Sequence, residues 1–347
     1  MSTGNAESVM SVEEIERELA RQRIGEEGRH DLRASVLNLI VLADEGLAAD
    51  VSGVISRISG RHPSRSIILI TDDDAPEDRL DVRLSTMCNV PGPEGRHVCS
   101  EQITLHAEGR YARQPERLAD PLLIPDLPVF LWSPGRVDLD SREFRRLAGL
   151  AERLILDSGT ASDSEETLAR MARFVREPEA PHLGDLQWTA LSSWRAFIAA
   201  LYDPVERAPA LRELRRLRIE HRPAGLSRSL LAAGWLGSSL GLEPRSVRRS
   251  GRTREYTFCG EQGEVTVELA QLESDERLPV VTIESERVTF ELAVGRLTVR
   301  EDGEVRERPV HLEAPGTGDL LGEELQFFGR DEAYEAALRV AGRLVEL

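Results

Sequence analysis

A short apolar run flanked by prolines constrains the fold of this chain more than any other stretch. Residues 129–132 (Val-Phe-Leu-Trp) follow Pro128 directly and are followed by a Ser-Pro-Gly turn. A continuous apolar run between turn residues is typical of a central strand that is covered on both faces. Because Pro125 and Pro128 cannot donate backbone hydrogen bonds, they limit the strand to about five residues. We predict that Trp132 is a core residue. Asp126 is either a turn residue or a polar group at a strand-end crevice.

The residues before this strand predict a parallel arrangement. An apolar strand within residues 33–43 is followed by an amphipathic helix that ends near Gly60, and a second apolar strand spans residues 66–71. A strand, a helix and a strand joined by short connections form a right-handed unit with parallel strands. Residues 80–88 and 98–107 alternate apolar and polar side chains, which indicates antiparallel strands at a sheet edge. The N-terminal half is therefore predicted as an α/β domain with a mixed, largely parallel sheet and helices on both faces.

The C-terminal half predicts a second domain. A helix over residues 226–242 contains Gly234 and Gly237, which favour close helix packing, and several short strands follow from residue 255 to residue 300. Their tight turns indicate an antiparallel meander in an α+β domain. The expected divisions are a polar segment with a short helix at 1–30, the α/β domain at 31–205 and the α+β domain at 206–347.

Charge and length exclude several classes of protein. The net charge of -17 argues against general nucleic-acid binding, which needs a basic surface. All 44 basic residues are arginines, so a phosphate-loop lysine, a Schiff-base lysine and a lysine general base are excluded. The sequence has no apolar run of about 18 residues and no signal-peptide pattern at its start. We expect a cytoplasmic protein with neither nucleic-acid nor membrane partners.

The known cofactor and metal motifs are missing. The turn after the first strand is Ala43-Asp-Glu-Gly46, which places two carboxylates where a glycine-rich turn would bind pyrophosphate. A dinucleotide enzyme is therefore disfavoured, and no cofactor or metal is expected. Cys88, Cys99 and Cys259 are unevenly spaced, which favours buried reduced thiols. A redox switch is the alternative, if the Cα atoms of Cys88 and Cys99 lie within about 7 Å of each other.

Two segments stand out as candidate interaction surfaces. Trp188, Trp194 and Arg195 lie within eight residues of a chain that has only four tryptophans, so they indicate either an interdomain seam or a partner anchor. Residues 245–254 hold five arginines and no acid, and we predict a loop there. Its arginines are Arg245, Arg248, Arg249, Arg252 and Arg254. This loop is either solvated or binds phosphate or an acidic partner surface, since guanidinium groups suit both.

Six segments in this order resemble the bacterial glucose-6-phosphate dehydrogenase assembly protein family. They are RASVLNL at 33–39, RHPSR at 61–65, CSEQ at 99–102, the stretch 122–132, LILDS at 154–158, and GDLQW at 184–188 with Trp194-Arg195. The resemblance covers residues 30–205 and is looser beyond them. It implies a non-catalytic protein of carbohydrate metabolism, in the pentose phosphate pathway. Such a protein would bind the oligomeric dehydrogenase and favour its active state. Ser133 departs from related sequences, which often continue the tryptophan run there.

Two other functions remain open at this point. A sugar-phosphate enzyme would use Asp126 and His62 as acid and base, with Arg65 on the phosphate. A metabolite sensor would bind its ligand through Arg61, Ser64 and Arg65. The candidate binding residues outside the arginine-rich segment are His62, Ser64, Arg65, Glu101, Gln102, Asp126, Trp132, Asp157, Ser158, Trp188, Trp194 and Arg195.

Overall fold

The computed structural model describes residues 10–22, 32–33, 35–89, 98–160, 163–261, 263–273, 280–312 and 315–347. Its contacts divide the chain into two compact units. The first comprises Met1–Leu156, Glu179–Leu183 and Gly316–Arg330, and the second comprises Asp157–Pro178, Gly184–Pro315 and Asp331–Leu347. This division starts the second unit earlier than residue 206, and the domain boundaries expected from the sequence stay a prediction.

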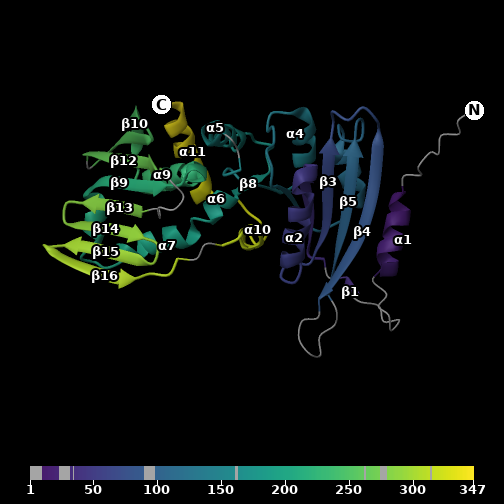
Figure 1. Ribbon diagram of the computed structural model, residues 1–347, viewed down its shortest axis with the longest axis horizontal. Helices are drawn as coiled ribbons and strands as arrows, with labels where there is room; N and C mark the ends of the chain where they lie inside the picture. The colour runs from purple at the N-terminus through teal and green to yellow at the C-terminus, as the bar shows by residue number, and fades with distance from the viewer. Residues whose placement is uncertain are drawn as a thin grey trace, which may run out of the picture. The chain divides into compact units, whose positions relative to one another are not determined.

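The first sheet is mostly parallel and has eight strands (Figure 1). The strands are β1 (Leu32–Arg33), β2 (Leu37–Ala43), β3 (Ser64–Asp72), β4 (Arg79–Asn89), β5 (Val98–Glu108), β6 (Val129–Ser133), β7 (Arg153–Leu156) and β8 (His182–Asp185). Their order is β1-β5-β3-β2-β6-β7-β8, and β4 pairs with β5 in the antiparallel sense. Both the central position of β6 and the antiparallel edge strand are confirmed.

This strand order is that of a doubly wound dinucleotide-binding fold. Omitting the short β1 and the edge strand β4, the sheet reads β5-β3-β2-β6-β7-β8, which is the order 3-2-1-4-5-6. The direction of winding reverses between β2 and β6, which pair in parallel. In such sheets ligands bind outside the carboxyl ends of the strands at this switch point. The strand order could not be worked out from the sequence.

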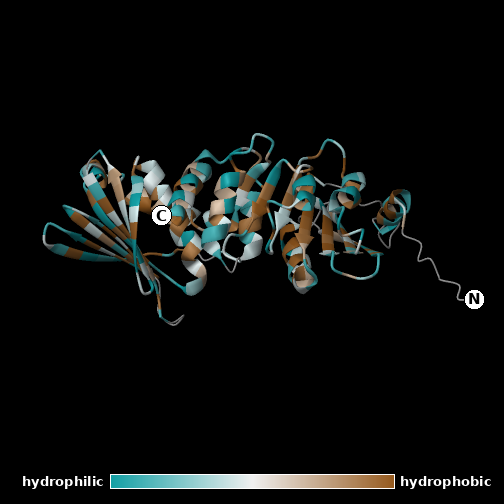
Figure 2. Cartoon of the chain, turned by 90° about the horizontal axis from the view of Figure 1, so that it is seen from above, coloured by the Kyte–Doolittle hydropathy of each residue, from teal (hydrophilic) through white to brown (hydrophobic). Residues whose placement is uncertain are grey.

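Helices lie on both sides of this sheet in Figure 1. They include α1 (Val12–Gln22), α2 (Ala48–Ile58), α3 (Pro115–Ala119), α4 (Arg142–Ala148) and α10 (Thr317–Glu324). Helix α1 packs against β4 through its buried Ile15 and Leu19, and α10 packs against α2. Figure 2 shows the strands of this unit as largely hydrophobic, which fits the complete burial of Ile40 and Ile67.

The second unit contains a mixed sheet of eight strands in the order β10-β11-β12-β9-β13-β14-β15-β16. These are β9 (Leu214–His221), β10 (Glu243–Ser250), β11 (Thr253–Gly260), β12 (Gly263–Gln271), β13 (Val280–Ser285), β14 (Val288–Ala293), β15 (Arg296–Glu301) and β16 (Glu304–Pro309). The predicted antiparallel meander is found for β13 to β15, and β16, which was not predicted, extends it. Strands β11 and β12 also pair in the antiparallel sense, but β9, which is parallel to β12, separates them from β13. The predicted arginine loop is wrong, because its residues build the β10–β11 hairpin. Arginine side chains can lie on an exposed edge strand, so their charge did not reveal a strand.

The helices of the second unit pack closely. They are α5 (Ser164–Phe174), α6 (Leu186–Thr189), α7 (Ser192–Leu201), α8 (Ala208–Arg212), α9 (Leu226–Ser239) and α11 (Glu332–Glu346). Helix α11 packs against both α9 and α5. A Cβ atom on Gly234 would lie 2.2 Å from the Ala337 carbonyl oxygen, so glycine is needed where α9 crosses α11. The expected role of Gly234 in close helix packing is confirmed.

The cysteines differ from the expectation of reduced thiols. Cys99 is disulfide-bonded and Cys259 is a free thiol. Residue 88 stands opposite Cys99 in the β4–β5 register, although the side chain of Cys88 lies outside the described residues. Directly opposed residues of antiparallel strands have Cα atoms about 4.5–5.5 Å apart, a spacing that allows a disulfide. The alternative considered from the sequence, in which positions 88 and 99 face each other across a hairpin, agrees with this register, whereas the favoured expectation of a reduced thiol is wrong for Cys99.

Candidate functional site

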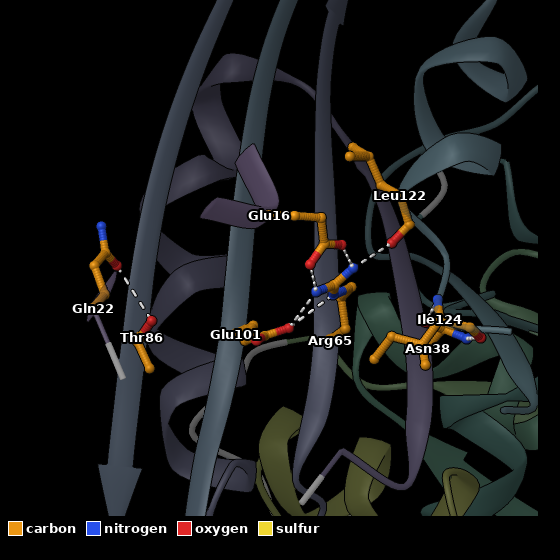
Figure 3. Close-up of polar contacts among 8 residues, drawn as sticks. All are labelled: Glu16, Gln22, Asn38, Arg65, Thr86, Glu101, Leu122 and Ile124. Atoms are coloured by element: carbon orange, nitrogen blue, oxygen red, sulfur yellow. Dashed lines mark hydrogen bonds and ion pairs between the residues drawn. The ribbon is translucent and has the colours of Figure 1, made fainter. Parts of the chain in front are cut away.

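Arg65 lies at the centre of a buried cluster in the first unit (Figure 3). Its side chain is 1% exposed, and its Nε atom donates to Glu101 Oε2 at 2.8 Å. Its Nη2 atom donates to Glu16 Oε2 at 3.1 Å, and its Nη1 atom donates to the Leu122 carbonyl oxygen at 3.0 Å and to Glu16 Oε1. Strands β3 and β5 bring Arg65 opposite Glu101 in register, so the sheet itself positions this ion pair.

A second contact holds the loop before β6. The Asn38 side-chain amide donates to the Ile124 carbonyl oxygen at 3.0 Å, and Asn38 Oδ1 accepts from the Ile124 amide at 2.9 Å. Asn38 is completely buried on β2. Together with the bond from Arg65 to Leu122, it fixes residues 122–127 against the sheet (Figure 3). Four of the six segments that resemble the assembly protein family therefore meet at this loop. They are residues 33–39, 61–65, 99–102 and 122–132.

The Arg65 guanidinium is held in ion pairs within the protein. Burial alone would lower the pKa of the Arg65 guanidinium, but Glu16 and Glu101 outweigh it and raise this pKa. The neighbouring Ser64 is buried and its hydroxyl lies 3.0 Å from that of Ser66. Gln102 donates to Thr104 Oγ1 at 3.3 Å within β5. Ser64, Arg65 and Gln102 thus make contacts within the protein, and their role in binding a ligand stays a prediction.

His62 and Asp126, the acid and base that a sugar-phosphate enzyme would use, have different surroundings. His62 is 9% exposed and packs near Gly322 of α10. Burial and the neighbouring Arg61 lower the pKa of His62. Asp126 is exposed at the turn before β6, where its φ of 66° is a conformation that aspartate tolerates. It lies at the amino end of the strand and not at the carboxyl-end crevice. Trp132 is 1% exposed, as predicted for a core residue.

The other two segments that resemble the family, at 154–158 and 184–188, contact each other through residues of the second unit. Asp185 is completely buried, and its Oδ1 atom accepts from the amides of Ser158 at 3.1 Å and Gln187 at 3.0 Å. Through the second bond it caps the N-terminus of α6. Gln187 Nε2 donates to Asp157 Oδ1 at 2.7 Å, and Arg228 Nε donates to Gln187 Oε1 at 3.0 Å. Asp157, Ser158 and Asp185 thus form one polar cluster.

The pKa values of two residues of this cluster, Asp185 and Arg228, differ from their ordinary values. Burial raises the pKa of Asp185 to about 7, helped by the charge of Asp157 and opposed by the hydrogen bonds from Ser158 and Gln187. Burial also lowers the pKa of Arg228, although Asp157 and Asp185 oppose that effect. A buried carboxyl whose pKa lies near neutrality changes charge within the physiological range. The sequence showed Asp185 only as part of a motif.

Trp188 and Trp194 have different surroundings. Trp188 is 2% exposed, its Nε1 atom donates to Asp331 Oδ2 at 2.8 Å, and the Arg195 guanidinium carbon lies 3.5 Å from the centre of its ring. Burial lowers the pKa of Arg195, while Asp331 raises it. Trp194 is only half-buried on α7, where Leu201 alone is fully buried. Trp188 is therefore a core residue, whereas Trp194 reaches the surface.

The arginines of the β10–β11 hairpin fall into two groups. Arg249 and Arg254 pair with Glu165 of α5, the second at 2.9 Å. Arg245, Arg248 and Arg252 are exposed, and Arg248 pairs with Glu255 on the neighbouring strand. Arg245 and Arg248 lie on β10, the edge strand of its sheet, and Arg252 lies in the turn that follows it.

The switch-point crevice of the first unit does not fit a dinucleotide. Asp44 follows β2, and its Oδ1 atom accepts from the Leu47 amide at 3.1 Å at the start of the helical segment. A Cβ atom on Gly135, just after β6, would lie 3.0 Å from Leu47 Cδ1 and 3.8 Å from Asp44 Oδ2. A leucine and a carboxylate therefore stand where the pyrophosphate of a dinucleotide would bind. Among the described side chains, no group of three or more histidine, cysteine, aspartate or glutamate residues could hold a metal ion.

Two family models match this chain. Residues 55–173 match the glucose-6-phosphate dehydrogenase subunit N-terminal domain, and residues 181–338 match the C-terminal domain of the same family. The chain belongs to the OpcA family. A relative from Nostoc punctiforme, named as the OxPP cycle protein OpcA, is 27% identical over 87% of this chain and 69% of its own length. A Synechocystis relative with the same name is 26% identical over 85% of this chain and 66% of its own length.

The OpcA chain also resembles solved oxidoreductases in fold. A 3-ketoreductase from Actinomadura kijaniata, solved in complex with TDP-benzene and NADP, has a TM-score of 0.52 and 12% identity, covering 89% of this chain and 96% of that chain. An NAD binding oxidoreductase from Klebsiella pneumoniae has a TM-score of 0.51 and 10% identity, covering 90% and 96%. This likeness agrees with the doubly wound sheet. Family membership ties the OpcA chain to the oxidative pentose phosphate cycle and to glucose-6-phosphate dehydrogenase assembly.

Several residues of these clusters were not predicted from the sequence. Glu16 contacts Arg65 from α1, Asn38 contacts the loop before β6 from β2, and Arg228 contacts Gln187 from α9. Their local sequence does not distinguish them, because Glu16 is one of several acidic residues of α1 and Arg228 lies between two serines of α9. Among the described residues, no helix is long and apolar enough to cross a membrane.

Proposed function

We propose that this chain is a non-catalytic assembly factor and allosteric activator of glucose-6-phosphate dehydrogenase in the pentose phosphate pathway. The observation that carries the proposal is the match of both halves of the chain to family models described as subunits of that dehydrogenase. The proposal includes direct binding to the oligomeric dehydrogenase and the cytoplasmic location expected from the sequence.

The physical basis of activation is preferential binding. A protein that binds the active form of an enzyme more tightly than the inactive form shifts the equilibrium by the difference in binding free energy. Such coupling is typically about 1–3 kcal/mol, which corresponds to a change of about 5–150-fold in the ratio of the two forms. This effect needs a surface that distinguishes the two forms, and it needs no catalytic residue.

The geometry supports binding over catalysis. The crevice that holds a cofactor in related folds contains Asp44 and Leu47, and Arg65 is enclosed by Glu16 and Glu101. His62 is buried with a lowered pKa. The sugar-phosphate enzyme and the metabolite sensor both depend on Arg65 binding a ligand, so neither gains support from this arrangement.

Two surfaces of the second unit are candidates for the contact with the dehydrogenase. The exposed arginines Arg245, Arg248 and Arg252 suit an acidic partner surface in a chain whose net charge is -17. Trp194 is half-buried on α7, and tryptophan is one of the residue types that dominate interface hot spots. We assign both surfaces to the proposed interface.

The binding experiment uses the full chain and purified glucose-6-phosphate dehydrogenase. Size-exclusion chromatography with light scattering is expected to show co-elution, and interferometry gives the dissociation constant. Trp194→Ala should weaken binding at least tenfold, or about 1.4 kcal/mol. Arg176→Ala, at an exposed arginine of the second unit outside both surfaces, is the matched control and should bind like wild type. Separate elution at micromolar concentrations, with no detectable binding, would rule out the proposal.

A further inference from the structure

Two adjacent phenylalanines are exposed on the turn that follows α10. Phe327 is 46% exposed and Phe328 is 54% exposed. Among the described residues, no other phenylalanine, tyrosine or tryptophan side chain is exposed. Adjacent exposed aromatics are informative because a single exposed apolar residue is ordinary, whereas a contiguous apolar patch commonly marks an interaction site.

A buried ion pair fixes the conformation of this turn. Arg153, at the start of β7, is 2% exposed and donates to Glu324 Oε2 from Nε at 3.0 Å and from Nη2 at 2.7 Å. Its Nη1 atom donates to the Gly329 carbonyl oxygen at 2.9 Å. Arg153 therefore holds the chain on both sides of the two phenylalanines. A buried ion pair often adds little net stability, so its contribution here is to define geometry.

Each phenylalanine also rests on a fixed group of the first unit. The Arg153 guanidinium lies 5.2 Å from the centre of the Phe327 ring. Phe328 packs edge-on against Phe130 of β6, with ring centres 5.6 Å apart. One side of each ring is thus held by the protein while the rest remains exposed. A side chain that is already ordered loses less conformational entropy on binding than a mobile one.

We propose that Phe327 and Phe328 form an aromatic anchor that inserts into an apolar pocket on the dehydrogenase. This inference rests on the proposed function and adds the surface and the chemistry of the contact. Half-exposed side chains on a turn cannot enclose a small ligand, so they fit a partner that supplies the pocket. Preorganised aromatic residues are the typical anchors of such contacts. The net charge of -17 is repelled by anionic membrane surfaces, which disfavours a lipid partner.

A second copy of this chain is a less suitable partner for the two phenylalanines than the dehydrogenase. The other exposed large apolar side chains of the described residues are one leucine and five valines, none adjacent in sequence to another. They are Val12, Val36, Val205, Val294, Val305 and Leu347. Apart from the phenylalanine pair itself, the described sequence therefore offers no second pair of adjacent exposed large apolar residues, whereas a different protein can supply an apolar pocket.

The test measures the affinity of the full chain for purified dehydrogenase by interferometry. Phe327→Ala with Phe328→Ala should weaken binding at least thirtyfold, or about 2 kcal/mol. Phe327→Ala alone, which keeps the contact between Phe328 and Phe130, should weaken it at least fivefold. Val294→Ala with Val305→Ala removes apolar groups that are more exposed than the two phenylalanines and should leave the affinity unchanged. Thermal unfolding and circular dichroism of each variant check that the fold is kept.

The outcomes separate this inference from the proposed function. If the wild-type chain binds and the double phenylalanine variant binds within threefold of it, the aromatic anchor is wrong while the assembly role stands. If the wild-type chain does not bind, the proposed function itself fails. Light scattering of the chain alone tests whether the two phenylalanines instead contact a second copy of this chain. A wild-type dimer that the double variant converts to a monomer would overturn the inference in favour of self-association.

Discussion

Arg65 and Glu101 form a buried ion pair, with Arg65 Nε 2.8 Å from Glu101 Oε2 and exposed fractions of 1% and 0%. Neighbouring parallel strands place the two residues opposite each other, and Glu16 adds a second carboxylate from α1. Because this pair links β3, β5 and α1, its main consequence is for folding of the first unit.

Arg65→Met should destabilise the protein strongly. Removing the guanidinium leaves the Glu101 carboxylate buried without its cation, which typically costs about 3–5 kcal/mol. Replacing both Arg65 and Glu101 by methionine should recover more than half of this loss, because no uncompensated charge remains. Urea unfolding of the three proteins at pH 7 measures the effect. A loss of less than about 1 kcal/mol for Arg65→Met would show that the pair is not the expected buried unit.

Asp185 should make stability depend on pH. Its pKa is raised from 3.8 to about 7 in the folded protein, so between these values the folded state holds a proton that the unfolded chain has lost. The free energy of unfolding should therefore fall as the pH rises from about 4 to 7, by on the order of 2–4 kcal/mol from this group. The stability that the bound proton contributes is fully lost once the pH exceeds the pKa of Asp185 in the folded protein.

Asp185→Asn is the matched control for this pH dependence. Asparagine keeps an oxygen that can accept from the Ser158 and Gln187 amides, but it does not ionise. The variant should lack this part of the pH dependence and gain stability relative to wild type at pH 8. Urea unfolding at several values between pH 4.5 and 8 provides the comparison. Parallel curves for the two proteins would contradict the raised pKa.

The two neighbouring tryptophans should separate stability from binding. Trp188→Ala removes a buried ring that stacks with Arg195 and bonds Asp331, so it should cost about 3–5 kcal/mol of unfolding free energy. Trp194→Ala should cost about 1 kcal/mol or less, since its side chain is only half-buried. Urea unfolding of both variants tests this difference. Equal destabilisation would mean that Trp194 is also a core residue.

The exposed hairpin arginines should control how fast the complex forms. Changing Arg245 and Arg252 to glutamate places negative charge on an edge that we assign to an acidic partner surface. Association with the dehydrogenase should slow at least fivefold at low salt, and the difference should shrink as salt increases. Arg176→Glu with Arg222→Glu, at two exposed arginines outside the hairpin, changes the net charge by the same amount and is the control. Equal rates for the hairpin and control variants would remove the hairpin from the interface.

Much of the fold could be predicted from local patterns. The apolar runs and their proline and glycine boundaries identified β2, α2, β3 and β6, because buried parallel strands and amphipathic helices leave distinct periodicities. Strand β10 was missed since an edge strand whose residues are mostly exposed carries no apolar alternation. The 3-2-1-4-5-6 order depends on pairings between distant segments, and no local pattern records them.

The candidate site was harder to predict than the fold. The sequence singled out Arg65 and Glu101 separately, but their pairing depends on the β3–β5 register. It singled out Trp188 and Arg195, whereas Asp331, which bonds Trp188, lies 143 residues further on. Arg153 and Glu324 are 171 residues apart. Polar residues that meet only through tertiary structure have no common signal in the sequence.

The most direct test of the central claim is dehydrogenase turnover measured against glucose-6-phosphate concentration, with and without a saturating amount of this protein. This protein assayed alone is the control. Preferential binding to the active form predicts a lower half-saturating concentration or a higher maximal rate, by at least about fivefold, and no turnover by this protein alone. Superimposable curves in the presence of demonstrated binding would contradict activation. Turnover by this protein alone would contradict its non-catalytic role.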